Sequence, residues 1–303
     1  MGTSTESFTH WRLSPAFSKL HAYDIGRALA YRRLDAVFQN APTVAFDDAT
    51  PLIFFSDCHR GDNSRADAFS VNEPLFLHAL HYYYQRGFTY VEVGDGDELW
   101  KNRRFHTVKE AHSQVFDRLH RFDDRQRLHL LLGNHDIWGA MCRQMNKDGL
   151  IAREGLILKH RQTGQQLYVT HGHQADFKSD RLYRFSRMAV RNVWRRLQLW
   201  GMAPVASPNG EERAPHPFER FLFEWAALHR RLLICGHTHR PVSATYGAPP
   251  YFNTGHCVAP GLLTGVEIRN GEIGLVRWRA TPWRSSPCQR EVLSEPRRLK
   301  YFD

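Results

Sequence analysis

The 303-residue sequence lacks several features that define specialised classes of protein. Nowhere does it contain the roughly 18 consecutive apolar residues that a membrane-spanning helix needs. The segment 1–19 has no apolar run behind a basic start, so we expect no secretion signal. No internal repeat or low-complexity tract is present. These absences predict a soluble protein of the cytoplasm.

Cysteine is also scarce. The five cysteines are scattered, odd in number and never two residues apart. Their spacing argues against a disulfide framework and against a zinc site built from thiolates, and it fits a reducing compartment.

What the sequence does contain is apolar residues, positive charge and histidine. Apolar residues make up 42% of the chain, enough for a sizeable core and against overall disorder. The formal net charge is +10, and 18 histidines are present. A basic protein favours anionic partners, such as a phosphorylated small molecule, an anionic membrane surface or nucleic acid.

Short apolar runs that end in polar clusters organise the chain. Such runs end at Phe55, Val93, Leu132, Thr170 and Cys235. Helical patterns cover 20–40, 73–86 and 106–122, and strands at 262–268 and 273–278 flank an Asn-Gly turn. Strand, polar loop and helix in alternation predict an α/β protein whose site lies at the carboxyl ends of its strands.

The five polar clusters together supply ligands for metal ions. They contain Asp57, His59, Asp95, Asn134, His171, His237 and His239. Mixed nitrogen and oxygen donors suit manganese, iron, zinc or cobalt better than calcium. Seven donors are too many for one ion, but two ions that share a carboxylate would use all of them.

These clusters resemble the signature of the calcineurin-like metallophosphoesterase superfamily. All five blocks occur in order: Asp57-Cys58-His59, Gly94-Asp95 through Glu98, Gly133-Asn134-His135-Asp136, His171-Gly172 and Gly236-His237-Thr238-His239. The resemblance implies a four-layer α/β/β/α sandwich, and the chain adds a helical insertion to it. It also implies two divalent metal ions, with manganese the first choice and iron, zinc or magnesium as alternatives.

The resemblance assigns a role to each matched residue. One metal would be held by Asp57, His59 and His239, the other by Asn134, His171 and His237, and Asp95 would bridge them. His135 would contact the substrate phosphate or protonate the leaving oxygen, while Asp136 would orient its imidazole.

Within the superfamily, the chain is most similar to the branch of the UDP-2,3-diacylglucosamine diphosphatases. Glu98-Leu99-Trp100 follows Gly94-Asp95 as in that branch, and Gly236-His-Thr-His-Arg-Pro241 matches it. His135 is a departure, because that branch commonly has arginine there. The resemblance implies a location in the cytoplasm with peripheral contact to the inner membrane.

The segment between the fourth and fifth clusters carries a stripe of arginines at helical spacing. Its members are Arg181, Arg184, Arg187, Arg191 and Arg195. Guanidinium groups on one helix face would bind phosphate, although a solvated face paired with acids elsewhere is an equal alternative. We interpret this segment as a helical insertion that stands over the site.

Five segments are therefore expected. They are an N-terminal helical extension (1–50), the first half of the core (51–179), a helical insertion or cap (180–231), the second half of the core (232–280) and a C-terminal tail (281–303).

The predicted function is hydrolysis of a phosphoester or diphosphate bond by a metal-activated hydroxide, with a UDP-2,3-diacylglucosamine-like substrate as its specific form. A nuclease or phosphodiesterase of the same superfamily is one alternative, supported by the positive charge. A non-enzymatic scaffold of this fold is another, although such a protein would be expected to lose ligands.

Overall fold

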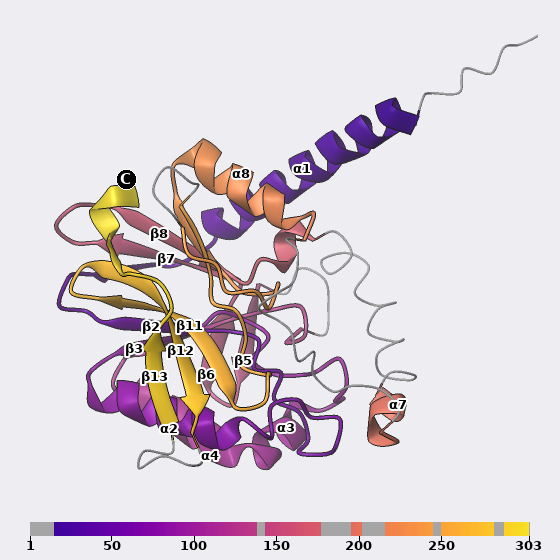
Figure 1. The fold of residues 1–303 in the computed structure, drawn as a ribbon, viewed down its shortest axis with the longest axis vertical. Helices are drawn as coiled ribbons and strands as arrows, with labels where there is room; N and C mark the ends of the chain where they lie inside the picture. The colour runs from indigo at the N-terminus through magenta and orange to yellow at the C-terminus, as the bar shows by residue number, and fades with distance from the viewer. Residues whose placement is uncertain are drawn as a thin grey trace, which may run out of the picture.

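The computed structural model describes residues 15–137, 143–176, 195–201, 216–244, 250–281 and 288–302, with side chains described from Tyr23 onward. Two β-sheets stack face to face, and helices cover both outer faces (Figure 1). This is the four-layer α/β/β/α arrangement that the sequence predicts, and it is confirmed.

The larger sheet has nine strands and holds three of the five polar clusters. Four neighbouring strands are parallel, in the order β2 (Leu52–Phe55), β3 (Thr89–Glu92), β4 (Leu128–Leu131) and β6 (Leu150–Arg153). Antiparallel strands extend both sides: β5 (Gln144–Lys147) beside β6, and β11 (Leu262–Arg269), β12 (Glu272–Ala280), β13 (Cys288–Val292) and β14 (Arg297–Arg298) beyond β2. The carboxyl ends of β2, β3 and β4 therefore meet at one edge.

The smaller sheet has five strands and carries the other two clusters. Its order is β1 (Thr43–Phe46), β7 (Gly155–His160), β8 (Gln166–Thr170), β9 (Leu232–Cys235) and β10 (Tyr251–Asn253). The β8, β9 and β10 strands are parallel, so the loops after β8 and β9 leave the same edge. Because β1 pairs with β7, residues 43–46 are part of this sheet, although the sequence placed them in a helical extension.

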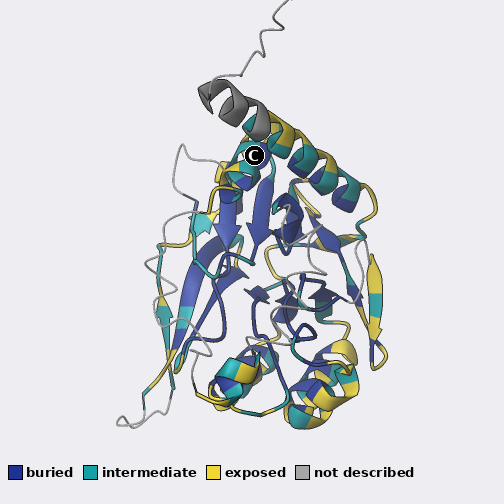
Figure 2. Cartoon of the chain, turned by 90° about the vertical axis from the view of Figure 1, so that its right-hand side faces the viewer, coloured by how far each residue is buried: buried dark blue, intermediate teal, exposed yellow. Residues whose placement is uncertain are grey.

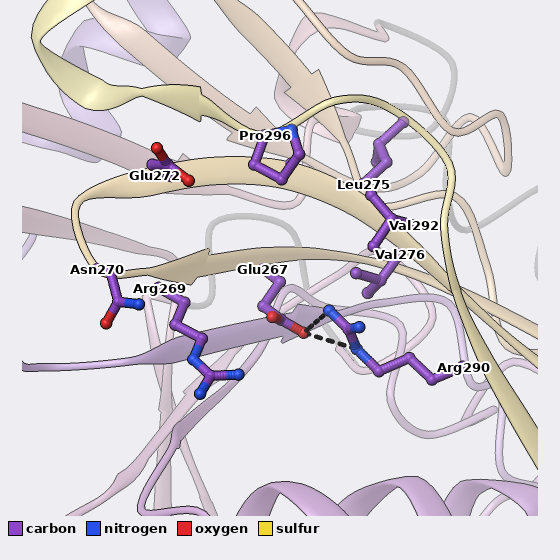
Figure 3. A pocket seen from close by; sticks show the side chains of 10 residues that line it. Glu267, Arg269, Asn270, Glu272, Leu275, Val276, Arg290, Val292 and Pro296 are labelled. Atoms are coloured by element: carbon purple, nitrogen blue, oxygen red, sulfur yellow. Dashed lines mark hydrogen bonds and ion pairs between the residues drawn. The ribbon is translucent and has the colours of Figure 1, made fainter.

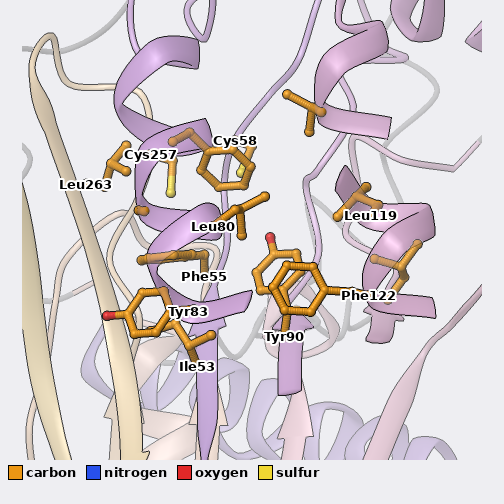
Figure 4. Close-up of a cluster of buried hydrophobic side chains, with 14 of the residues drawn as sticks. Ile53, Phe55, Cys58, Leu80, Tyr83, Tyr90, Leu119, Phe122, Cys257 and Leu263 are labelled. Carbon is orange, nitrogen blue, oxygen red and sulfur yellow. The ribbon is translucent and has the colours of Figure 1, made fainter. Parts of the chain in front are cut away.

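The apolar runs of the central strands are continuous because both of their faces are buried. In β2, Leu52 and Phe54 face the smaller sheet, while Ile53 and Phe55 face the helices on the opposite side. Figure 4 shows Ile53 and Phe55 among the buried side chains of this outer layer. Truncation of one such phenylalanine to alanine would cost about 3–5 kcal/mol.

Helices α2 (Glu73–Gln85) and α4 (Ser113–Asp123) cover the larger sheet, and α1 (Pro15–Gln39) and α8 (Glu219–His229) cover the smaller one. Each exposes one face and buries the other (Figure 2). The shorter helices are α3 (Phe105–Ala111), α7 (Arg195–Leu199) and the 3₁₀ turns η1 (His173–Ala175) and η4 (Leu299–Phe302).

The structure differs from the predicted helix over 106–122, which is split into α3 and α4 at His112. His112 has φ −122° and ψ 38°, and its buried ring is hydrogen-bonded to Asp67 (2.8 Å) and Glu73 (3.1 Å). These side-chain partners on both ring nitrogens hold His112 at the break.

Helix α8 also differs from its expected place in a cap over the site. Leu222, Trp225 and Ala226 are buried against α1 and the smaller sheet, so α8 belongs to an outer layer of the core. Only its beginning approaches the polar clusters, where the Phe218 ring lies 5.3 Å from that of His237.

The Asn270-Gly271 turn has the expected form. Both residues have positive φ (53° and 71°), which a type I′ hairpin requires, and β11 and β12 pair around them. Among the described residues, no helix is long and apolar enough to cross a membrane.

Candidate metal centre

The loops after β2, β3, β4, β8 and β9 bring the predicted ligands together from both sheets. Three groups of potential ligand atoms lie within 4.8 Å of one another: Asp57, His59 and His239; Asp95, His171 and His237; and His59, Asp95 and His135. Asp95 belongs to two of these groups. Its Oδ2 lies 3.2 Å from His171 Nε2 and 3.8 Å from His59 Nε2. Asp95 is thus placed between the two halves of the cluster, where a bridging ligand would be.

Each central carboxylate has one oxygen fixed and presents the other to the cluster. Asp57 Oδ2 accepts hydrogen bonds from Ser56 Oγ and from the backbone N–H of His237 (3.0 Å). Asp95 Oδ1 accepts one from the backbone N–H of His135 (2.8 Å). The free oxygens lie near histidine: Asp57 Oδ1 is 3.1 Å from His239 Nε2. These bonds orient the carboxylates before any ion binds.

The backbone at the site is strained. Asp57, His59, Asp95, His237 and His239 all have φ between 50° and 70°, a left-handed conformation that is uncommon outside glycine. Backbone bonds between neighbouring loops, such as Asp57 N–H to Gly94 O (3.1 Å) and His59 N–H to Asp95 O (2.9 Å), hold it in place. Such strain persists only where the surroundings fix it, and it concentrates at functional sites.

Glycine lets two of these loops approach closely. A Cβ atom at Gly94 would lie 2.7 Å from His171 Cγ, and one at Gly133 would overlap the Asp95 carboxylate. These glycines are therefore required by the close contact of the ligand loops.

His171 presents one ring nitrogen to the cluster. Its Nδ1–H donates to the Val93 carbonyl (2.8 Å), which leaves Nε2 with a lone pair in the neutral ring. That lone pair faces Asp95 Oδ2 at 3.2 Å, an acceptor against an acceptor. Burial lowers the pKa of His171, but the charges of Asp95 and Asp57 raise it to about 9, so without a metal ion a proton occupies the gap.

The carboxylates are anionic at neutral pH. Burial raises the pKa of Asp57, but His239 and His171 outweigh it and hold the pKa well below its usual range. Burial likewise raises the pKa of Asp95, and the charges of His171 and His135 lower it further than burial raises it.

The donor set fits a pair of divalent ions. Asp57 Oδ1, Asn134 Oδ1 and His171 Nε2 are buried and have no hydrogen-bond partner within the described chain. Buried polar atoms are normally paired, so unpaired atoms on residues of the ligand loops fit a role in holding a cation. Two carboxylates, a carboxamide and several imidazoles are ligands that borderline divalent ions accept.

His135 is held by residues other than the predicted Asp136. Its Nδ1–H donates to Glu98 Oε1 (2.8 Å), and its ring stacks on Trp100 with centroids 4.0 Å apart. Trp100 is fixed in turn by a bond from its Nε1–H to the carbonyl of Asn134 (2.5 Å). The expectation that Asp136 orients His135 is wrong, and Glu98 takes that place.

Asp136 belongs to a closed ionic network beneath the site, which consists of Arg60, Glu92, Asp97, Asp136 and Lys147, all buried. Arg60 makes a two-bond contact with Glu92 (2.7 Å each) and donates to Asp97 (2.8 Å). Lys147 lies 2.7 Å from both Asp97 and Asp136. Asp136 also accepts the backbone N–H of Asp97 and of Gly133, which ties the loops after β3 and β4 together.

Sequence reasoning left Asp97 and Glu98 undecided and missed Lys147 and Asp176. The Glu98-Leu99-Trp100 motif carried a signal for Glu98 and Trp100. Lys147 lies in an edge strand with no motif around it, and Asp176 Oδ2, 3.5 Å from His237 Nε2, follows the fourth cluster by several residues. Only the folded chain brings these two to the site.

Of the arginine stripe, Arg181, Arg184, Arg187 and Arg191 lie outside the described residues. Arg195 begins α7 and forms an ion pair with Asp62 (2.6 Å) in the loop after β2.

A separate hollow of 210 Å³ lies on the antiparallel side of the larger sheet, where Arg290 pairs with Glu267 at 2.7 Å (Figure 3). None of the candidate metal ligands lines it.

Comparison with known proteins gives only distant similarity. No family model matches the sequence, and no curated protein is detectably similar to it. Among solved structures, vacuolar protein sorting 29 from Cryptosporidium parvum is 11% identical, with 82% of this chain and all of that chain covered and a TM-score of 0.38. A cold-active protein tyrosine phosphatase is 17% identical, with 84% of this chain and 80% of that chain covered and a TM-score of 0.40. At this level of similarity, the proposals below rest on the geometry of the site.

Proposed function

We propose that this chain is a two-metal phosphohydrolase of the calcineurin-like metallophosphoesterase type, which cleaves a phosphoester or diphosphate bond. The observation that carries the proposal is the convergence of Asp57, Asp95 and the histidines from five strand ends, with Asp95 between two ligand groups. Pairs of metal ions are used by enzymes for displacement at phosphorus.

The residues divide into two ligand sets. Asp57, His59 and His239 would hold one ion and Asn134, His171 and His237 the other, with Asp95 shared. When bound, such ions supply a water of lowered pKa and positive charge for the phosphoryl oxygens.

His135 would act on the substrate side of the centre. Its ring is partly exposed, while Glu98 fixes Nδ1 and Trp100 fixes the ring plane. This leaves Nε2 to contact a phosphoryl oxygen or to give a proton to the leaving oxygen.

We also propose a substrate, a location in the cell and a metal for this enzyme. The Glu98-Leu99-Trp100 motif supports a substrate like that of the UDP-2,3-diacylglucosamine diphosphatases, and the stacking of Trp100 on His135 places that motif beside the centre. A nucleotide-linked lipid would place the enzyme in the cytoplasm, in peripheral contact with the inner membrane. We propose manganese as the metal, with iron, zinc and magnesium as alternatives.

Hydrolysis of an aryl phosphate with added Mn²⁺ tests the proposal. Asp95→Ala and His237→Ala should each lower turnover at least about 100-fold, because each removes a ligand. Asp24→Ala and His106→Ala are matched controls at exposed positions and should keep full activity. Thermal unfolding checks that every variant is folded.

Unchanged turnover in Asp95→Ala or His237→Ala would refute the metal assignment. A panel of UDP-linked lipids, nucleotides, phosphodiesters and oligonucleotides then separates the candidates. Faster cleavage of oligonucleotides than of every small molecule would make the protein a nuclease instead.

A further inference from the structure

A basic cavity lies between the loop after β3 and helix α7. Its volume is 540 Å³, within the ~300–1,000 Å³ of typical ligand pockets. The cations that line it are Lys101, Arg103, Arg104, Arg195 and Arg196, and Asp62 is the one acid among its lining residues. Three of the arginines, at 103, 104 and 196, are exposed. The metal centre and this cavity are formed by consecutive parts of the same loop.

Asp62, the acid among the lining residues, already pairs with groups of the protein. Asp62 Oδ2 pairs with Arg195 at 2.6 Å, and its Oδ1 accepts the backbone N–H of Ser64 at 3.3 Å. Within the described parts of the chain, no carboxylate pairs with Arg103, Arg104 or Arg196. Among the lining residues, three like charges therefore share one hollow without a paired carboxylate from the described segments, an arrangement that favours an anion.

The cavity adjoins the proposed reaction centre through two residues. Lys101 lines it, and its Nζ is held between the carbonyl of Ala66 (3.2 Å) and Glu98 Oε2 (3.9 Å). The other oxygen of Glu98 holds His135 Nδ1 (2.8 Å). An anion in the cavity would thus lie on the same side as His135, where the leaving group is expected.

We propose that this cavity binds a second phosphate group of the substrate, carried on the leaving group away from the scissile bond. The inference rests on the proposed function and specifies its substrate class as molecules with two separated phosphates. Arginine suits this role because its planar fork gives paired hydrogen bonds to phosphate oxygens. Its volume of 540 Å³ favours a small molecule over a nucleic acid duplex.

Binding is tested first, because it does not depend on hydrolysis. Inorganic diphosphate is titrated calorimetrically into the full chain purified without added metal. The double variant Arg103→Gln/Arg104→Gln should bind it at least about tenfold more weakly than the wild type. Arg121→Gln, an exposed arginine on α4, is the matched control and should bind as the wild type does. Equal binding by the double variant and the wild type would overturn the proposal.

Kinetics with added Mn²⁺ then assign the anion to the substrate. For adenosine 3′,5′-bisphosphate the double variant should raise KM about tenfold, with kcat unchanged, because the cavity binds but does not react. For adenosine 5′-monophosphate, both constants should stay unchanged. An equal loss for both nucleotides would overturn the assignment to a second phosphate.

Two further outcomes distinguish the proposed function from the proposed phosphate-binding cavity and test the small-molecule class of the ligand. If the wild type hydrolyses no phosphate compound but still binds diphosphate through Arg103 and Arg104, the proposed function fails, and so does the assignment to a substrate. If a short oligonucleotide displaces the diphosphate at lower concentration than a nucleoside bisphosphate does, the small-molecule class is overturned.

Discussion

Two buried polar clusters lie side by side at the strand ends, and they differ in how completely they are satisfied. In the network of Arg60, Glu92, Asp97, Asp136 and Lys147, every charged side chain faces an opposite charge at 2.7–2.8 Å. In the candidate metal centre, three ligand atoms lack a hydrogen-bond partner within the described chain, and five residues have left-handed φ. The network thus pairs its acids with the permanent cations Arg60 and Lys147, whereas the centre pairs its acids with imidazoles.

The comparison shows that burial of acids does not by itself identify a site. Asp95 and Asp97 are two residues apart and equally buried, yet their environments differ. Burial raises the pKa of Asp97, but Arg60 and Lys147 hold it at about 2 with their permanent charges. Asp95 faces imidazoles, whose lone pairs can take a metal ion instead of a proton. A permanent cation as partner thus marks Asp97 as a structural acid, whereas imidazole partners mark Asp95 as a candidate metal ligand.

The largest expected effect on stability comes from removing Lys147 from the buried ionic network. Lys147→Met removes the cation beside Asp136 and leaves Asp97 with Arg60 alone, so it should lower the free energy of unfolding by about 3–5 kcal/mol. Lys109→Met is the matched control, because Lys109 pairs with Asp148 at 2.6 Å on the surface, where a pair contributes at most about 1 kcal/mol. Urea denaturation measures both. A smaller effect for Lys147 than for Lys109 would contradict the closed network.

Binding of metal ions at the candidate centre should stabilise the folded protein. Mn²⁺ at about 100 times its Kd should raise the free energy of unfolding by about 2.7 kcal/mol, because it binds the folded chain alone. Asp95→Ala should abolish this gain without preventing folding. Thermal unfolding with chelator and with Mn²⁺ provides the measurement, and equal shifts in both proteins would place the ion elsewhere.

Glu98 connects the centre to its surroundings, and its replacement should affect catalysis more than stability. Glu98→Gln keeps the shape but removes the charge beside His135, so kcat should fall about 10–100-fold. Glu98→Ala, which removes the hydrogen-bond acceptor as well as the charge, should lower kcat further than Glu98→Gln does. A change in KM alone would argue against a positioning role.

The smallest expected effect is a pH-dependent change in stability at His112, a buried histidine outside the candidate metal centre. Burial lowers the pKa of His112, but hydrogen bonds and charge from Asp67 and Glu73 raise it above its usual value. A raised folded-state pKa stabilises the protein at pH below the unfolded value of ~6.5, and this contribution is lost as the pH rises through the folded value. The wild type should therefore exceed His112→Gln in stability by more at about pH 5 than at about pH 9. A pH-independent difference in urea denaturation would show that the ring is neutral.

The sequence was most informative where ligand residues follow apolar strands. The carboxyl ends of neighbouring parallel strands lie at the same edge of a sheet. The sequence alone therefore predicts that the clusters after Phe55, Val93 and Leu132 lie close together. Such reasoning cannot show which acid contacts which base. Asp136 lies in a loop, so no strand period fixes the direction of its side chain, and Lys147 reaches it from the edge strand β5. Strand β1 was missed because it is only four residues long and closely follows α1, so the sequence alone does not separate it from the helical extension.

The left-handed backbone at the ligand positions bears on how such a chain could change over generations. Glycine adopts this conformation without strain, so replacing His239 by glycine removes a ligand and relaxes the loop in one step. Loss of catalysis by this route leaves the sandwich intact. An inactive descendant would keep its shape and remain free to acquire a binding role.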